Sequence, residues 1–407
     1  MTAPLVSFPL AIWIICSTAI QPFSGSKLAW AVTVVLLVFA TLAHRQFLHT
    51  MRLSIPLVTY LAWLALSVFW SVLPGVTAVE VVLQVLLVGA GLLMAVGRDP
   101  AQLLRLFADT AAGFVLVNIA VGLFAPSIGR SSEGPYTNVT RGLFADKNLF
   151  AFFTVLALGA AMCVLLDAWR TRAVSLLDVA RPAVAVVGVL LSDSATGLSL
   201  SVATILLVVL LGFLGRTRRA SVVPVAGVLL ALTSLAWVAY AQWSAVLGLL
   251  GRSATLTGRT RIWYAVIRAI EQRPWQGYGW KALWVDGDPT TIRIWADNYG
   301  VPFYHAHDGY LDMTAQLGIV GLVLTLLFLG TILVRGWRNT VRRGTGADMW
   351  PVLLVAVMAL YNTTEVMGFT TVAWVFLVAL SSALPARRKE RECTSPMPGA
   401  SPSASTR

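Results

Sequence analysis

The sequence predicts an all-α, polytopic membrane protein with about 12 transmembrane helices and one large extracytoplasmic loop. Hydrophobic residues make up 57% of the 407 residues and charged residues only 12%, which is about half the charged share of a soluble domain. The apolar residues fall in long runs rather than in alternation, and this argues against an outer-membrane barrel. The same composition excludes a soluble enzyme with one large core and a disordered chain.

Twelve apolar segments follow one another along the chain, each near the roughly 20 residues that a membrane-spanning helix needs. Residues 1–22 carry no basic stretch ahead of the first segment, so they are expected to form a span rather than a cleaved signal peptide. The seventh segment is irregular because Asp178, Arg181 and Pro182 lie in its first half. Between the last two segments, residues Tyr361 to Gly368 either interrupt one long helix or reverse the direction of the chain. The segments are 4–22, 28–43, 55–72, 78–96, 104–125, 149–169, 173–191, 197–215, 221–240, 314–334, 350–366 and 369–385.

Basic residues follow every even-numbered segment, which predicts a multi-pass protein of the bacterial inner membrane with both termini cytoplasmic. Most of the 30 Lys and Arg fall on that side, and this accounts for the net charge of +12 without nucleic acid. Ten further bases lie in two loops predicted to face outside. They favour an anionic ligand there, with ordinary surface charge as the alternative. These bases are Arg130, Arg141, Lys147, Arg252, Arg259, Arg261, Arg268, Arg273, Lys281 and Arg293.

Residues 1–385 are expected to form a single integral membrane domain that includes residues 241–313 as an extracytoplasmic loop subdomain. Within that loop, apolar residues at helical spacing predict a helix from Arg259 to Gln272. A second helix is predicted to start near Asp308 and to run into the tenth segment. The Pro- and Ser-rich residues 386–407 are predicted to be a disordered cytoplasmic tail. The three cysteines are far apart and imply neither a disulfide framework nor a cysteine metal site.

Four polar motifs stand at the predicted outer face. They are Thr140 to Asn148 (T-R-G-L-F-A-D-K-N), Ser192 to Gly197 (S-D-S-A-T-G), Thr257 to Trp263 (T-G-R-T-R-I-W) and His305 to Asp312 (H-A-H-D-G-Y-L-D). In this order the motifs resemble those of the O-antigen ligase and polysaccharide polymerase superfamily, with the greatest similarity to the exopolysaccharide polymerase type. The motifs cover roughly residues 130–335, and hydropathy alone extends the resemblance over the rest.

The resemblance implies a metal-independent, inverting glycosyltransferase that uses no cofactor. The donor would be a glycan on undecaprenyl diphosphate at the outer face of the inner membrane. The acceptor would be a hydroxyl of a growing glycan, a lipid core or a protein, so polymerase and ligase both stay open. His307 takes the position of the family's catalytic base, and Arg259 and Arg141 take those of arginines that bind the diphosphate. One departure is Asp308, where the family usually has Asn.

The chemistry of these residue types agrees with the assignment. A sugar hydroxyl is a poor nucleophile, so a base must remove its proton during attack. Histidine titrates near working pH, and Asp308 or Asp312 could orient it. Guanidinium groups stabilise the charge of a departing diphosphate, and Lys147 and Arg261 are predicted to share that task. The residues predicted to support the site are Asn148, His305, Asp308 and Glu365.

Several alternatives remain. His305, His307 and Asp308 could form a metal site, or His307 could be a structural histidine at the membrane interface. A lipid-linked sugar flippase or other transporter would keep ionisable groups near the membrane midplane, where Asp178 and Arg181 are the main candidates. Aromatic residues of the loop could form an interfacial belt and a loop core, or one or two could stack on sugar. These are Trp263, Trp275, Tyr278, Trp280, Trp284, Trp295 and Tyr310.

Overall fold

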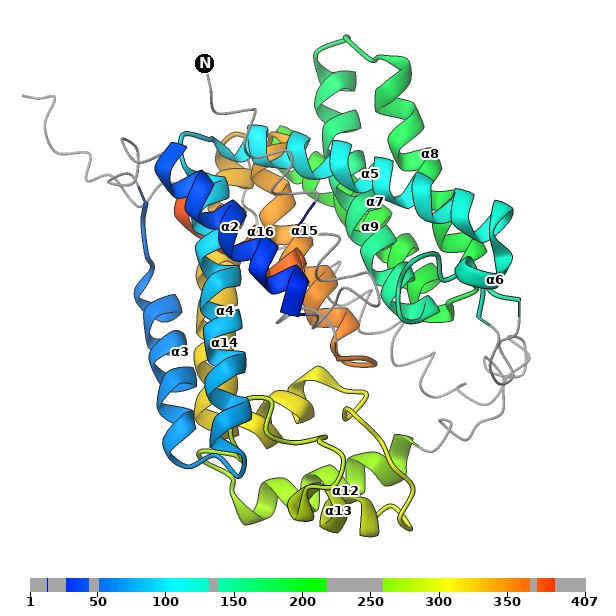
Figure 1. The fold of residues 1–407 in the computed structure, drawn as a ribbon. Coiled ribbons are helices and arrows are strands. Elements are labelled where there is room, and N and C mark those ends of the chain that lie inside the picture. Colours follow the sequence, from blue (N-terminus) through cyan, green and yellow to red (C-terminus); the bar gives the residue numbers. More distant parts are fainter. Residues whose placement is uncertain are drawn as a thin grey trace, which may run out of the picture.

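The computed structural model describes Trp13 and residues 27–43, 51–131, 138–217, 259–366 and 372–384. This part of the chain is helical, apart from loops and one isolated antiparallel bridge between Arg130 and Thr140 (Figure 1). The prediction of an all-α fold is therefore confirmed for the described residues. The predicted tail 386–407 lies outside them.

Helices of two lengths make up the membrane part. Those long and apolar enough to cross a membrane are α4 (Pro74–Ala95), α5 (Pro100–Phe124), α7 (Lys147–Arg170), α9 (Ala195–Thr217) and α14 (Gly309–Arg342). Shorter apolar helices are α2 (Lys27–Ala43), α3 (Ile55–Leu66) with the 3₁₀ turn η2 (Ser67–Phe69), α15 (Gly346–Tyr361) and α16 (Val372–Ala383). The number of about 12 spans stays a prediction, because only five of the described helices meet that length.

The predicted segments correspond well to helices where they can be compared. Segments 4–22, except Trp13, and 221–240 lie outside the described residues, and the other ten each overlap a helix. The last two segments are separate helices, since α15 ends at Tyr361 and α16 begins at Val372. The sequence left that point open.

The irregular seventh segment has a local explanation. Helix α8 (Leu176–Leu191) begins at a capping box in which Ser175 accepts from the Asp178 N–H and the Asp178 carboxylate accepts from the Ser175 N–H. Asp178 also pairs with Arg181, which in turn pairs with Asp109 of α5 at 2.6 Å. Asp178 thus caps the start of α8, and Arg181 links it to α5 through an ion pair, so these charges stabilise a helix N-terminus.

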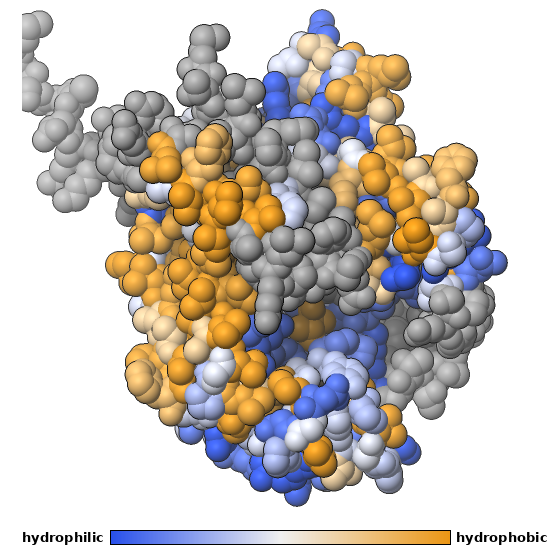
Figure 2. Space-filling model, in the orientation of Figure 1, coloured by the Kyte–Doolittle hydropathy of each residue, from blue (hydrophilic) through white to orange (hydrophobic). Residues whose placement is uncertain are grey.

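Helix α7 lies at the centre of the membrane part. It packs against α5, α8, α9 and α15, and most of its apolar stretch is buried. Phe107 of α5 makes ring contacts with Phe153 of α7, Trp350 of α15 and Phe376 of α16. The outer faces of α3, α4, α5 and α9 keep large apolar side chains exposed, visible in part as orange surface in Figure 2. A surface of that kind suits contact with lipid.

A second, smaller core belongs to the loop subdomain. It contains Val266 of α12 (Arg259–Gln272), Ile294 of α13 (Pro289–Ala296), Tyr278 and Phe303. Helix α12 has the bounds that the sequence predicted, and α14 begins one residue after Asp308. The short helix α13 was missed in a stretch read as loose. Its sequence signal is Asp288, whose carboxylate accepts from the Thr291 N–H, followed by a proline at the first helical position.

A kink in α14 joins the two parts of the molecule. Gly318 has φ 70° and ψ −179°, so the backbone leaves the helical path there. Two indole N–H groups bind nearby: Trp63 donates to the Leu317 carbonyl and Trp70 donates to the Gln276 carbonyl. The Ile319 N–H donates to the Pro274 carbonyl at 2.8 Å. The loop after α12 is therefore held against the kink by backbone hydrogen bonds.

Candidate functional site

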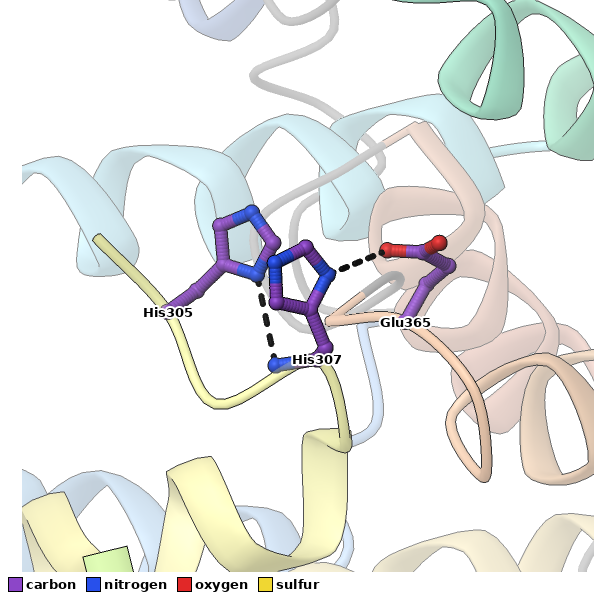
Figure 3. A group of neighbouring side chains, drawn as sticks. All are labelled: His305, His307 and Glu365. Atoms are coloured by element: carbon purple, nitrogen blue, oxygen red, sulfur yellow. Dashed lines mark hydrogen bonds and ion pairs between the residues drawn. The ribbon is translucent and has the colours of Figure 1, made fainter. Parts of the chain in front are cut away.

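Glu365 joins three residues from distant parts of the chain. Its Oε1 accepts from Arg259 Nη2 at 2.7 Å and from Asn148 Nδ2 at 3.0 Å. Its Oε2 lies 3.3 Å from Nδ1 of His307 (Figure 3). We call Asn148, Arg259, His307 and Glu365 the carboxylate cluster. All four were predicted site residues, and the structure brings them together around one side chain.

Helix ends position the members of the carboxylate cluster. Asn148 lies in the first turn of α7, where the Asp146 carboxylate accepts from the N–H groups of Asn148 and Leu149. Arg259 is the first residue of α12. Glu365 follows the C-terminal end of α15, where its own N–H donates to the Tyr361 carbonyl. Helix ends present side chains beyond the apolar bundle, which suits a site at the membrane surface.

His307 lies directly before the N-cap of α14 and is held in an uncommon backbone conformation. Its φ is 51°, in the left-handed region that costs free energy for a residue with a Cβ. Neighbouring contacts fix the loop there. Trp263 Nε1 donates to the Ala306 carbonyl at 3.0 Å, and the Gly309 N–H donates to the Asn362 carbonyl at 2.7 Å. Such a conformation persists only where the surroundings determine it, as at many active sites.

The contact with Glu365 determines which ring nitrogen of His307 can accept a proton. An ionised carboxylate can only accept, so Nδ1 must carry the proton that it shares with Oε2. In the neutral ring Nε2 then holds a lone pair and can accept a proton. The side chain is 31% exposed while that of Glu365 is 6% exposed. The ring can therefore meet a substrate while the carboxylate behind it stays buried.

The ionisation of Glu365 follows from its partners. Burial raises the pKa of this carboxyl, but the hydrogen bond from His307 and the positive charge of Arg259 outweigh it. The net result is a pKa below the ordinary value. Arg259 also donates through Nη1 to the Thr364 carbonyl at 2.5 Å. Its guanidinium thus engages a carboxylate and a carbonyl together, a forked geometry that lysine cannot make.

The His305 ring packs against the His307 ring. Their ring centroids are 4.0 Å apart, and His305 Nδ1 accepts from the His307 N–H at 3.3 Å. Burial, and then the neighbouring His307, lower the pKa of His305. A ring with a lowered pKa that accepts through Nδ1 suits a supporting role beside His307.

Neither aspartate that the sequence offered as a partner for the His307 ring has that contact. Asp308 is the N-cap of α14, and its Oδ1 accepts from the N–H groups of Tyr310 and Leu311 at 2.9 Å. Asp312 accepts from the Ala306 N–H and from Trp284 Nε1. Glu365 orients the ring instead. Asn and Asp are similarly good N-caps, so Asp308 can replace the asparagine of the family motif without affecting the ring.

Lys147 and the Ser192–Gly197 turn form a further layer behind Asn148. Lys147 Nζ donates to the Asp193 carbonyl at 3.0 Å and is largely buried. Ser194 Oγ donates to Asn148 Oδ1 at 3.2 Å. Asp193 has φ 46°, so the turn is in a tight, unusual conformation. These contacts orient the Asn148 amide, so that its N–H₂ group faces Glu365.

Arg141 and Arg261, both predicted to bind the diphosphate, have other partners. Arg141 Nη1 donates to the carbonyls of Phe144 and Ala145 in its own loop. Arg261 stacks over the Tyr299 ring with 4.4 Å between its Cζ and the ring centroid. Side chains that are two residues apart on a helix point in directions about 200° apart. Arg261 therefore does not share the partners of Arg259.

Close packing explains why the R-G motif has a glycine at its second position. Gly142 has φ 61°, and a Cβ there would come within 2.2 Å of Asn118 Oδ1. The same oxygen accepts from the Leu143 N–H at 2.7 Å. Part of this motif therefore builds the loop before α7 and thereby places Asn148.

His305, His307 and Glu365 are also the described side chains that could surround a metal ion, since one ligand atom from each lies within 4.8 Å of the others. Arg259 occupies the same carboxylate. A guanidinium at that distance disfavours a second cation, because like charges repel each other strongly at a buried site. The ion pair with Arg259 is therefore an alternative explanation for the position of Glu365.

Sequence reasoning did not predict the contacts of several residues that hold this site together. Tyr361 Oη donates to the Asn148 carbonyl at 3.0 Å, and Tyr310 Oη donates to the Ala359 carbonyl at 2.8 Å. Ser194 was part of a noted motif but received no role. The central position of Glu365 also had no signal beyond its place at a span end, because its partners are 58, 106 and 217 residues away in the sequence.

Comparison with known proteins gives two findings. Residues 182–326 match the family model described as O-Antigen ligase. The chain is also 28% identical over 278 residues to the exopolysaccharide production protein ExoQ of Rhizobium meliloti (strain 1021). That match covers 65% of this chain and 61% of the relative. Together they confirm the resemblance that the four motifs indicated.

The family match includes part of the carboxylate cluster. It spans the Ser192–Gly197 turn, Arg259 and His307, and it ends before Glu365. The match and the five long apolar helices indicate a multi-pass membrane protein.

Proposed function

We propose that this protein is a membrane glycosyltransferase that moves a glycan from undecaprenyl diphosphate to a hydroxyl acceptor at the outer face of the bacterial inner membrane. The observation that carries the proposal is the arrangement of Glu365 between Arg259 and His307, with Oε1 on the arginine and Oε2 on the histidine. One buried carboxylate thus fixes a cation and a base side by side. Transfer from a lipid diphosphate to a hydroxyl requires both groups.

In the proposed reaction His307 is the general base. Its Nε2 accepts the proton of the acceptor hydroxyl as the oxygen attacks the anomeric carbon of the donor sugar. The bond from that carbon to the diphosphate oxygen breaks, and its electron pair leaves with the lipid diphosphate. Glu365 stabilises the imidazolium that forms, because its carboxylate already holds Nδ1. A single displacement of this kind inverts the anomeric configuration.

Arg259 is the proposed electrostatic partner of the leaving diphosphate. Negative charge grows on the diphosphate as the bond breaks, and a positioned guanidinium stabilises it. Two of its nitrogens already bind Thr364 and Glu365, which fixes the plane of the group. Lys147 and Arg141 are proposed to add positive charge at the same face rather than direct contacts within the carboxylate cluster.

The relative from Rhizobium meliloti is called an exopolysaccharide production protein, and this name favours a growing glycan as acceptor. Polymerisation is therefore our first proposal, and ligation to a lipid core or protein hydroxyl is the second. A flippase is less well supported, because Asp178 and Arg181 cap and fasten the start of α8 rather than line a path through the membrane.

The test is transfer by the purified protein from a synthetic undecaprenyl diphosphate saccharide to candidate acceptors. Longer glycan on the lipid identifies a polymerase, and glycan on a foreign acceptor identifies a ligase. His307→Ala should lower the transfer rate by about 10²–10⁴-fold with donor binding retained, since loss of a base acts on the chemical step. His305→Ala should cost less, and EDTA should have no effect.

Full activity of His307→Ala in a folded protein would overturn the assignment of the base. Equal losses in both histidine variants together with EDTA sensitivity would point to a metal site at His305, His307 and Glu365 instead.

A further inference from the structure

Asp312 is a buried carboxylate close in sequence to the proposed base, and the reaction described above does not use it. It lies in the first turn of α14 and is only 3% exposed. None of the ion pairs within the described part of the chain includes it. Burial of a carboxylate without a paired charge is costly, so its hydrogen bonds have to offset that cost.

Three N–H groups donate to the Asp312 carboxylate. Oδ1 accepts from Trp284 Nε1 at 2.9 Å and from the Ala306 N–H at 3.1 Å. Oδ2 accepts from Gln316 Nε2 at 2.5 Å. An ionised carboxylate only accepts hydrogen bonds, so it can satisfy three donors at once. An asparagine of the same shape would turn an N–H₂ group toward one of them.

The bond to Ala306 anchors the residue directly before His307. Ala306 is fully buried, and both of its backbone groups are held. Its N–H donates to Asp312 of α14, and its carbonyl accepts from Trp263 of α12. Figure 3 shows that the loop with His305 and His307 runs directly into a helix. Because the φ of 51° at His307 persists only where the surroundings determine it, this anchor fixes where the strained residue begins.

Gln316 extends the network to the loop after α12. Its Nε2 faces the carboxylate, so its Oε1 points the other way and accepts from the Lys281 N–H at 2.7 Å. Its backbone carbonyl accepts from the Gly279 N–H at 2.9 Å. The amide cannot turn over without placing two donors face to face. The acceptor-only carboxylate of Asp312 therefore sets the direction of every hydrogen bond from Lys281 to Ala306.

We propose that Asp312 is a positioning residue for the base: through the Ala306 N–H it holds the backbone of His307 where the ring can meet Glu365. The inference rests on the proposed function of His307. Asp312 acts through the backbone and not on the reacting atoms. A favourable interaction with the helix dipole is the simpler role for an acid in a first turn, but that role requires neither burial nor three donors.

The first test moves the negative charge by one helical turn, in the full-length protein. Asp312→Asn turns an N–H₂ group toward Gln316 Nε2, and Gln316→Glu places two carboxylates face to face. Each single change should lower kcat about 10- to 100-fold, because a base that is misplaced by about 1 Å loses much of its effect. The KM values for donor and acceptor should change little, since substrate binding is not affected.

The double variant Asp312→Asn/Gln316→Glu should recover. The new asparagine can donate to the new glutamate, whose other oxygen can accept from the Lys281 N–H, so each donor again has an acceptor. Asp312 and Gln316 are 3% and 2% exposed, so the charge moves between equally buried positions. We expect kcat within about 3-fold of the wild-type value, as for two residues of one network that compensate each other.

Asp288→Asn is the control for the amide substitution. Asp288 is 8% exposed and accepts from the Thr291 N–H at 2.8 Å in the same subdomain. It is the N-cap of α13, and asparagine caps a helix about as well as aspartate. Its kcat should stay at the wild-type value. An equal fall in this variant would show that any buried carboxylate of the loop subdomain has the same effect, and Asp312 would lose its special role.

The second test follows the anchor itself and does not need turnover. Hydrogen–deuterium exchange is measured by mass spectrometry on residues 303–308 of the protein in nanodiscs. The Ala306 N–H, bound to a carboxylate in the wild type, should exchange about 10- to 100-fold faster in Asp312→Asn, as expected for the loss of a hydrogen bond to a charged group. Protection should return in the double variant.

The two readouts separate this inference from the proposed function. Protection that is lost and recovered in a protein without transfer activity would sustain the anchor and remove the proposed function. An inactive His307→Ala together with unchanged exchange in Asp312→Asn would do the reverse. Wild-type kcat in Asp312→Asn, or a double variant that is no better than Asp312→Asn in kcat or in folding, would also overturn the positioning role.

Discussion

Glu365 follows three polar residues, Asn362, Thr363 and Thr364, but its side-chain partners lie far away in the sequence, and the side chain is only 6% exposed. An unpaired carboxylate at such a position would be costly, because burial disfavours charge. The Arg259 guanidinium and the Asn148 amide offset that cost. Removal of Glu365 would therefore take one hydrogen-bond partner from each of Arg259, Asn148 and His307.

Arg259→Lys tests how much of this depends on geometry rather than charge. Lysine can keep the ion pair with Glu365 but cannot also donate in plane to the Thr364 carbonyl. Loss of a hydrogen bond to a charged group costs about 1.5–3 kcal/mol, so the transfer rate should fall about 10- to 150-fold. Arg268→Lys is the control, since this arginine is exposed on the same helix. Near-normal rates for Arg259→Lys would leave only a general electrostatic role.

His305 gives the protein a pH-dependent stability whose sign follows from its lowered pKa. The unfolded state has the ordinary histidine pKa, about 6.5, so below that pH it binds more protons than the folded state. Stability should therefore fall as pH drops from about 7 to 5. His305→Asn should weaken this dependence, as measured by thermal unfolding across that range. Identical pH slopes for the two proteins would contradict a lowered pKa of His305 in the folded state.

The kink in helix α14 brings the loop that follows α12 close to the helix backbone. Its backbone departs from the helix at Gly318, and a Cβ there would come within 2.0 Å of the Trp275 carbonyl oxygen. That oxygen accepts from the Val320 N–H just beyond the kink. The absence of a side chain at Gly318 leaves room for this close approach. The loop subdomain, and with it Arg259, is thereby fixed relative to His307.

Gly318→Ala should disrupt this junction. The substitution combines a backbone conformation that is essentially restricted to glycine, which costs about 1–3 kcal/mol for other residues, with a backbone clash that no side-chain movement relieves. We expect a fall in the unfolding temperature and loss of most transfer activity. Gly330→Ala is the matched control, because a Cβ there meets nothing within 4 Å and alanine favours a helix. Equal stability of the two variants would show that the kink does not need glycine.

Arg170 lies at the end of the molecule opposite to the site. Arg170, at the end of α7, donates to carbonyls of Gly344 and Gly212, and Gly215 near the end of α9 lies against Gly344. The carboxylate cluster gathers at the opposite ends of α7 and α14. This separation agrees with the predicted topology, in which bases mark the cytoplasmic side.

Cysteine labelling tests that topology. In a protein whose Cys16, Cys163 and Cys393 are replaced, a single cysteine at Ser253 should react with an impermeant reagent on intact cells, and one at Thr217 should not. Labelling at 217 alone would place the site in the cytoplasm. It would also end the proposal of a lipid carrier at the outer face.

The sequence alone predicted most of the helices and named the residues of the carboxylate cluster as site candidates. Composition and run length predict an all-α membrane protein, and helical spacing predicts Arg259–Gln272, because these depend on local periodicity. Tertiary structure decided which polar groups meet. Glu365 rather than Asp308 orients His307, Asp312 accepts from the Ala306 N–H, and Arg141 and Arg261 have other partners. Those outcomes depend on how helix ends far apart in the chain pack together, and no local pattern in the sequence records that packing.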